Sequence, residues 1–148
     1  VDGKTQSAGA KAKAIVLRKE FTEERDLFSI DYTSAYSTPN LDKLIRTFVY
    51  DRQGEGNFTV SDEFTANVPI RFETAITTQA DWKVLDDTRL LLTSGTEQMI
   101  VNIEASGKVA FTSETIEVNA SAYTRIGIAL KEQAEKGYIW LKMQAKQL

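Results

Sequence analysis

The sequence offers few side chains for catalytic chemistry, because its 148 residues include no histidine and no cysteine. Histidine is the side chain whose unperturbed pKa lies nearest neutrality, and cysteine supplies the thiolate nucleophile. Their absence excludes the Ser-His-Asp, Cys-His and HExxH mechanisms. The remaining catalytic possibilities are a carboxylate pair, a tyrosine base, a perturbed lysine and an all-oxygen metal site. The sequence shows no recognisable arrangement of residues for any of them. We therefore predict no catalytic residue, no metal site and no cofactor in this chain, and no enzymatic activity of the chain alone.

One carboxylate stands out by its position in a strand pattern. Asp62 alternates with Val60 and Phe64, so it shares their face. A carboxylate on an apolar face needs a charged partner or a place at the margin of the sheet. We expect Asp62 to form a structural ion pair with Arg46 or Arg71.

The aromatic residues are candidates for stacking on sugar rings, although a place in the core or at a domain interface is favoured for each one singly. Trp82 is the most interesting of them because it lies between charged residues near a turn, in "DWKVLDD". It is a candidate for a substrate cleft or an interface.

Apolar residues alternate with polar ones along most of the chain, and this period of two predicts strands. Ile15 and Leu17 share one face, as do Phe28, Ile30 and Tyr32. About eleven short segments follow this pattern, one of them the run at 69–78 that begins with Pro69. Turn-forming residues separate the segments at 37–40, 52–57, 94–96, 106–108 and 135–137. Strands at this spacing without a long helical stretch predict an all-β sandwich or barrel.

Length and composition place the chain among globular proteins. Its size suits one domain over residues 1–148, and no linker or repeat divides it. No apolar run reaches the ~18 residues of a membrane span. The net charge of −3 argues against a nucleic-acid partner.

Five segments resemble, in their order, the C-terminal β-sheet domain of the heparinase II/III-like polysaccharide lyases. They are "VDGKTQ" (1–6), "DYTSAY" (31–36), "RTFVY" (46–50), "FTVSDEF" (58–64) and "PIRFETAITT" (69–78). The match covers roughly the first 80 residues in register. The matched positions are Asp2, Gly3 and Gln6 in the turn, Asp31, Ala35 and Tyr36 in the second segment, and Arg46 and Asp62 in the strand pair.

The resemblance implies an antiparallel β-sandwich of about eleven strands that is one piece of a larger, secreted or periplasmic protein. Family members carry the catalytic residues in an N-terminal α/α toroid, which would lie upstream of Val1. The chain would then be a non-catalytic domain that packs on the toroid and walls a cleft for an acidic polysaccharide. Asp2 and Gln6 are the best cleft candidates by position. Thr77 stands at or beside the place of a family histidine, so the resemblance does not extend to a metal site that uses it.

Two other classes of function fit the same strand pattern. An autonomous carbohydrate-binding module would need a coplanar set of exposed aromatic rings. A structural or adhesive sandwich would need an unpaired edge strand. A large apolar area exposed on one face would instead favour the accessory domain, because a domain separated from its neighbour leaves its interface bare.

Overall fold

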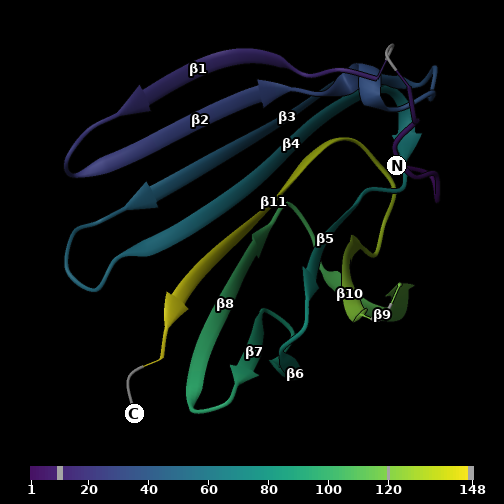
Figure 1. The fold of residues 1–148 in the computed structure, drawn as a ribbon. Coiled ribbons are helices and arrows are strands. Elements are labelled where there is room, and N and C mark those ends of the chain that lie inside the picture. Colours follow the sequence, from purple (N-terminus) through teal and green to yellow (C-terminus); the bar gives the residue numbers. More distant parts are fainter. Residues whose placement is uncertain (10–11, 120, 147–148) are drawn as a thin grey trace.

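The computed structural model describes residues 1–9, 12–119 and 121–146, and this part of the chain is almost entirely β-structure (Figure 1). The elements are β1 (Ile15–Phe21), β2 (Arg25–Asp31), the 3-10 turn η1 (Thr33–Ala35), β3 (Leu41–Asp51), β4 (Asn57–Ile70), β5 (Glu73–Thr78), β6 (Asp81–Asp86), β7 (Arg89–Ser94), β8 (Glu97–Ala105), β9 (Val109–Val118), β10 (Ser121–Leu130) and β11 (Ala134–Ala145). Within these residues no helix has the length and apolarity to cross a membrane.

The strands form two antiparallel sheets. The large sheet has eight strands in the order β1-β2-β3-β4-β11-β8-β7-β6, and the small sheet has three in the order β5-β10-β9. Figure 1 shows the large sheet as a curved layer, with the small sheet on one side of it. The predicted all-β sandwich of about eleven strands is confirmed.

The chain passes from one sheet to the other directly after β4. This strand ends at Ile70, the backbone turns at Arg71 and Phe72, and β5 begins the small sheet. The prediction of a single strand over 69–78 is therefore wrong. Pro69 lies inside the end of β4, where the register between β4 and β11 is irregular, and a residue without an amide hydrogen is tolerated at such a point.

The core lies where the two sheets face each other. The rings of Phe64 from the large sheet and Phe72 from the corner stack with centroids 4.6 Å apart. The most deeply buried apolar residues around them are Leu44, Ile70, Leu90, Val101, Ile126, Ile128 and Ile139. Because these residues come from both sheets, the core holds the small sheet against part of the large one.

A predicted turn at 135–137 is also wrong, because these residues belong to β11. Gly137 is a close-approach glycine here. A Cβ at this position would lie 2.9 Å from a ring carbon of Phe64 and 2.6 Å from the hydroxyl oxygen of Ser106. The loop predicted from "RQGEGN" does connect β3 to β4, with Gly54 and Gly56 at positive φ.

Candidate functional site

The site begins with the Asp-Gly turn at residues 1–4. Asp2 and Gly3 have φ angles of 49° and 71°, and the Lys4 amide donates to the Val1 carbonyl over 2.9 Å. Positive φ at both central residues is the type I′ geometry that Asp-Gly sequences favour. The Asp2 carboxylate accepts from the Arg71 amide at 2.8 Å, and the Asp2 amide donates to the Arg71 carbonyl, also at 2.8 Å. These bonds fix the N-terminal segment to the corner between β4 and β5.

An open groove of about 980 Å³ runs between this N-terminal segment and the small sheet. Both predicted cleft candidates, Asp2 and Gln6, line it. Their roles differ, since the Asp2 carboxylate is occupied by the backbone of Arg71, whereas the Gln6 side chain lies beside Tyr36, which also lines the groove. The structure therefore brings two of the three candidates together.

Charged side chains of both signs surround the groove. The Arg125 guanidinium contacts the Glu73 carboxylate at 2.5 Å and the Glu114 carboxylate at 3.5 Å. Other cations line the groove without a carboxylate in ion-pair range among the described residues, namely Lys4, Arg71 and Lys131. The groove thus combines four cationic and three acidic side chains in a chain whose net charge is −3. The formal charge of these groove side chains is therefore +1, whereas that of the whole chain is −3.

Three groove residues, Glu73, Arg125 and Lys131, were not predicted from the sequence. Glu73 and Arg125 are 52 positions apart and meet only because β5 pairs with β10. The sequence carries one signal for the contact between Glu73 and Arg125. Gly127 stands in the middle of a strand pattern, where a glycine often marks a place at which another group approaches the backbone closely. A Cβ on Gly127 would lie 2.4 Å from the Thr112 hydroxyl oxygen and 2.9 Å from the Glu73 carboxyl group, so this glycine makes room for both side chains.

A buried polar network lies next to the groove. Arg46 binds the Asp62 carboxylate with two hydrogen bonds of 2.7 Å, and the Tyr32 hydroxyl donates to the same carboxylate at 2.9 Å. Arg46 also donates to the Thr74 hydroxyl on β5, so it joins the two sheets. The predicted ion pair of Asp62 is confirmed, and its partner is Arg46. Tyr36 connects the groove to this network, with its ring 6.1 Å from that of Tyr32.

The environment shifts the pKa values of three of these groups. Burial and the nearby Asp62 charge raise the pKa of Tyr32 far above its ordinary value. Burial also raises the pKa of Tyr36, and the Gln6 side chain opposes the rise. Desolvation acts to lower the pKa of Arg46, but hydrogen bonding and the charge of Asp62 outweigh it, so the pKa is raised. Both tyrosines are neutral and Arg46 is charged near neutral pH, so neither tyrosine is poised as a base.

Trp82 lies apart from the groove. It belongs to β6 at the edge of the large sheet, faces Leu92 on β7 and packs against the core. It is absent from the residues that line the groove. Among the described residues there is also no cluster of three or more carboxylates that could hold a metal ion.

Solved structures with a similar fold include heparinase III and a heparan sulfate lyase. A heparinase III structure superposes with a TM-score of 0.67 at 16% identity, over 89% of this chain and 21% of that chain. A mutant of the heparan sulfate lyase HepC from Pedobacter heparinus gives a TM-score of 0.65 at 14% identity, over 92% of this chain and 22% of that chain. The resemblance to the C-terminal β-sheet domain of the heparinases is confirmed. At these identities the likeness is one of fold.

A second heparinase III matches in the same way, with a TM-score of 0.67 at 10% identity. The chain spans about a fifth of the length of the heparinase chains that it matches. A scan against protein-family models and a search of curated proteins both find no match. The heparinase-like fold is therefore visible in the structure at a level of sequence identity that those two comparisons do not detect.

Proposed function

We propose that this chain is the non-catalytic β-sandwich domain of a heparinase II/III-like polysaccharide lyase. In this proposal it packs on an α/α toroid of the same polypeptide. The surface that carries its groove forms one side of a cleft for an acidic polysaccharide. The observation that carries the proposal is the groove itself, where cations gather beside the Asp-Gly turn that resembles the family. A secreted or periplasmic location follows from a polysaccharide substrate.

The groove residues have distinct roles in the proposal. Lys4, Arg71 and Lys131 attract carboxylate or sulfate groups, because their charges are not neutralised by a neighbouring carboxylate. Gln6 contacts the glycan through hydrogen bonds. Asp2 acts through the turn that it holds against Arg71. Trp82 contacts a neighbouring domain from the edge strand β6.

The chemistry of lyase catalysis would take place on the missing domain. A lyase needs a base that removes the proton at C5 of a uronate and an acid that assists the departure of the sugar oxygen. This chain has no histidine, and burial raises the pKa of Tyr36, the tyrosine that lines the groove. The contribution of the chain is then to bind and orient the substrate.

The first test is to sequence the source DNA upstream of the Val1 codon. An upstream reading frame that encodes a long helical region behind a signal peptide supports the proposal. A start codon or signal-peptide cleavage site directly before Val1 contradicts it. The parent protein and the isolated chain are then assayed on heparan sulfate through the ultraviolet absorbance of the unsaturated product, and we expect activity from the parent alone.

The second test concerns the groove. Heparan sulfate oligosaccharides are titrated into the chain by calorimetry, with the variants Arg71→Ala and Lys131→Ala and with Lys142→Ala as a control outside the groove. Each groove variant should bind about fivefold more weakly, which corresponds to ~1 kcal/mol for an exposed charge pair. Equal affinities of groove and control variants would contradict the proposed cleft wall.

A further inference from the structure

The small sheet covers only part of the large one, because three strands face eight. The core cluster occupies the covered part. The cross-strand register places further side chains on the same face, with Phe28 opposite Phe48, Phe48 opposite Val60, and Tyr50 opposite Phe58. We call these residues and Met99, all of them outside the core cluster, the aromatic patch: Phe28, Phe48, Tyr50, Phe58, Val60 and Met99.

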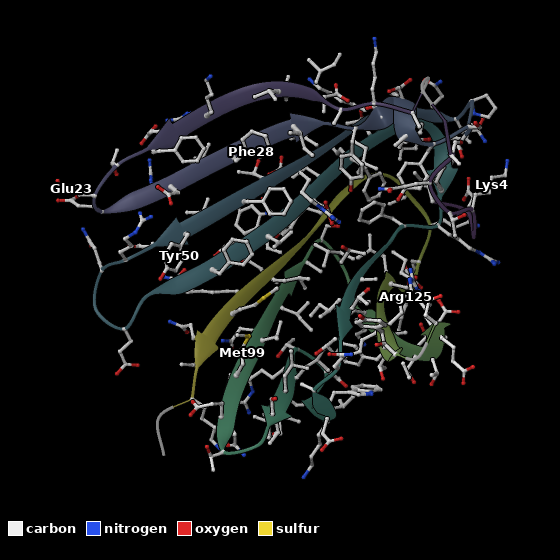
Figure 2. The ribbon with its side chains drawn as sticks, viewed as in Figure 1. Lys4, Glu23, Phe28, Tyr50, Met99 and Arg125 are labelled. Atoms are coloured by element: carbon white, nitrogen blue, oxygen red, sulfur yellow. The ribbon has the colours of Figure 1, made fainter. Side chains whose placement is uncertain are left out.

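The aromatic patch is continuous across several strands. The rings of Phe28 and Phe48 stack at 6.5 Å, and those of Phe48 and Phe58 at 6.3 Å. Tyr50 and Met99 are exposed. Figure 2 shows Phe28, Tyr50 and Met99 along the part of the large sheet that lies away from β5, β9 and β10. The patch is thus an ordered apolar surface, and the small sheet does not cover it.

The chemistry of the patch favours an apolar protein surface over a glycan. Its one side-chain oxygen is the Tyr50 hydroxyl, whereas sugar recognition needs several placed hydrogen-bonding groups. The charged residues beside it bind each other, since Arg52 pairs with Asp26 and lies over the Tyr50 ring. An occupant must therefore gain its affinity from burying apolar area.

The size of the patch favours a tethered occupant over a second copy of the chain. Tyr50, Phe58 and Met99 are 43%, 37% and 38% exposed, and the other three residues are partly exposed. The exposed area is then about 350 Å², because a large aromatic side chain presents roughly 150–250 Å². A stable complex of separate molecules buries roughly 800 Å² per partner. Interfaces between domains of one chain start at about 300 Å² per side, because tethering supplies a high effective concentration. The heparinase chains that share this fold are about five times as long as the matched part, which leaves ample chain for such an occupant.

We propose that the aromatic patch is a docking surface for an apolar face of another domain in the same parent polypeptide. This inference rests on the proposed function only in requiring a longer parent chain. It assigns this contact to the open part of the large sheet, on β2, β3, β4 and β8, in addition to the contact proposed for Trp82 on β6. Domain docking is thereby separate from the groove between the N-terminal segment and the small sheet.

The test uses the absence of cysteine from the chain, which lets a single introduced thiol be labelled selectively. Phe58→Cys places a thiol in the patch, and Trp140→Cys places one on the opposite face of the same sheet. The two positions have the same exposed fraction, 37%. Alkylation rates are measured by peptide mass spectrometry in the isolated chain and in the parent protein. We expect the Phe58→Cys thiol to react about tenfold more slowly in the parent, as for a site that is reached only by local opening, and the Trp140→Cys thiol to react equally in both.

Several outcomes would overturn the inference. Equal rates for Phe58→Cys in parent and isolated chain would mean that the patch has no intramolecular occupant. Protection that grows with the concentration of the isolated chain would identify a second copy as the occupant, and protection by heparan sulfate oligosaccharides would identify a glycan. Protection in a parent that lacks a helical lyase domain would support the docking surface and contradict the proposed function.

Discussion

Removal of the Asp62 carboxylate should be among the most destabilising single changes in this protein. Asp62 is 1% exposed and accepts three hydrogen bonds, two from Arg46 and one from Tyr32. In Asp62→Ala the Arg46 guanidinium, which is 27% exposed, keeps its charge but loses its carboxylate partner, and only the hydroxyl of Thr74 remains bonded to it. Breaking a buried pair by removing one partner costs about 3–5 kcal/mol, and the partial exposure of Arg46 favours the lower end. We expect the free energy of unfolding to fall by about 3 kcal/mol and Tm to fall by roughly 6–12 °C.

Urea unfolding followed by the fluorescence of Trp82 and Trp140 measures this change. The matched control is Asp26→Ala, which removes the carboxylate of the exposed pair with Arg52. Solvent screens an exposed pair, so the free energy of unfolding of the control should change little.

A double variant tests the cause of the loss. Replacing Arg46 and Asp62 together by leucine removes both charges, and an apolar replacement of a buried pair is often close to neutral. The double variant should therefore be more stable than Asp62→Ala. A loss below about 1 kcal/mol in Asp62→Ala, or a double variant whose loss equals the sum of the single losses, would refute the view that the unpaired charge sets the cost.

Three other changes have expected outcomes. Gly137→Ala should lower the free energy of unfolding by about 1–3 kcal/mol through overpacking against Phe64, whereas Gly107→Ala, with no atom within 4 Å of the added carbon, should change it by less than about 0.5 kcal/mol; both are measured in urea. The pKa of Tyr32 is raised in the folded state, so above pH 10.0, the ordinary pKa of tyrosine, the unfolded chain loses the proton first and the free energy of unfolding falls as pH rises. In thermal melts Tyr32→Phe should make this fall less steep. An unchanged slope would contradict the expectation. The Arg52 hydrogen bond lowers the pKa of Asp26 in the folded state. The stability that Asp26 contributes is therefore present above pH 3.8, the pKa in the unfolded chain, and is lost as pH falls through the folded-state pKa. Because the pair is exposed, 1 M salt should reduce this acid-induced loss.

The period of two was enough to predict most of the strands and the partner requirement of Asp62. It assigns each residue to one face of the sheet, and a carboxylate on an apolar face then requires a cationic side chain as its partner. The Asp-Gly turn was equally readable, since few other dipeptides accept two positive φ angles. These features depend on residues close together in the sequence.

Pairings between distant strands could not be read in this way. The sheet change at Arg71 and Phe72 lies inside an alternating run and carries no glycine, so the segment looked like one strand. The contact between Glu73 and Arg125 depends on β5 pairing with β10, and alternation does not specify which strands are neighbours. For the same reason the sequence showed many apolar faces but not which part of the large sheet stays uncovered.

The hydrogen bond from Arg46 to Thr74 has a consequence for how the two layers are aligned. Apolar side chains alone would allow one sheet to slide over the other by a side-chain repeat and still bury similar area. Such a slide would draw the guanidinium away from Thr74 and leave a donor facing hydrocarbon. The hydrogen bond therefore favours one alignment of the two sheets. It thereby also sets the position of the groove that β5 and β10 help to form.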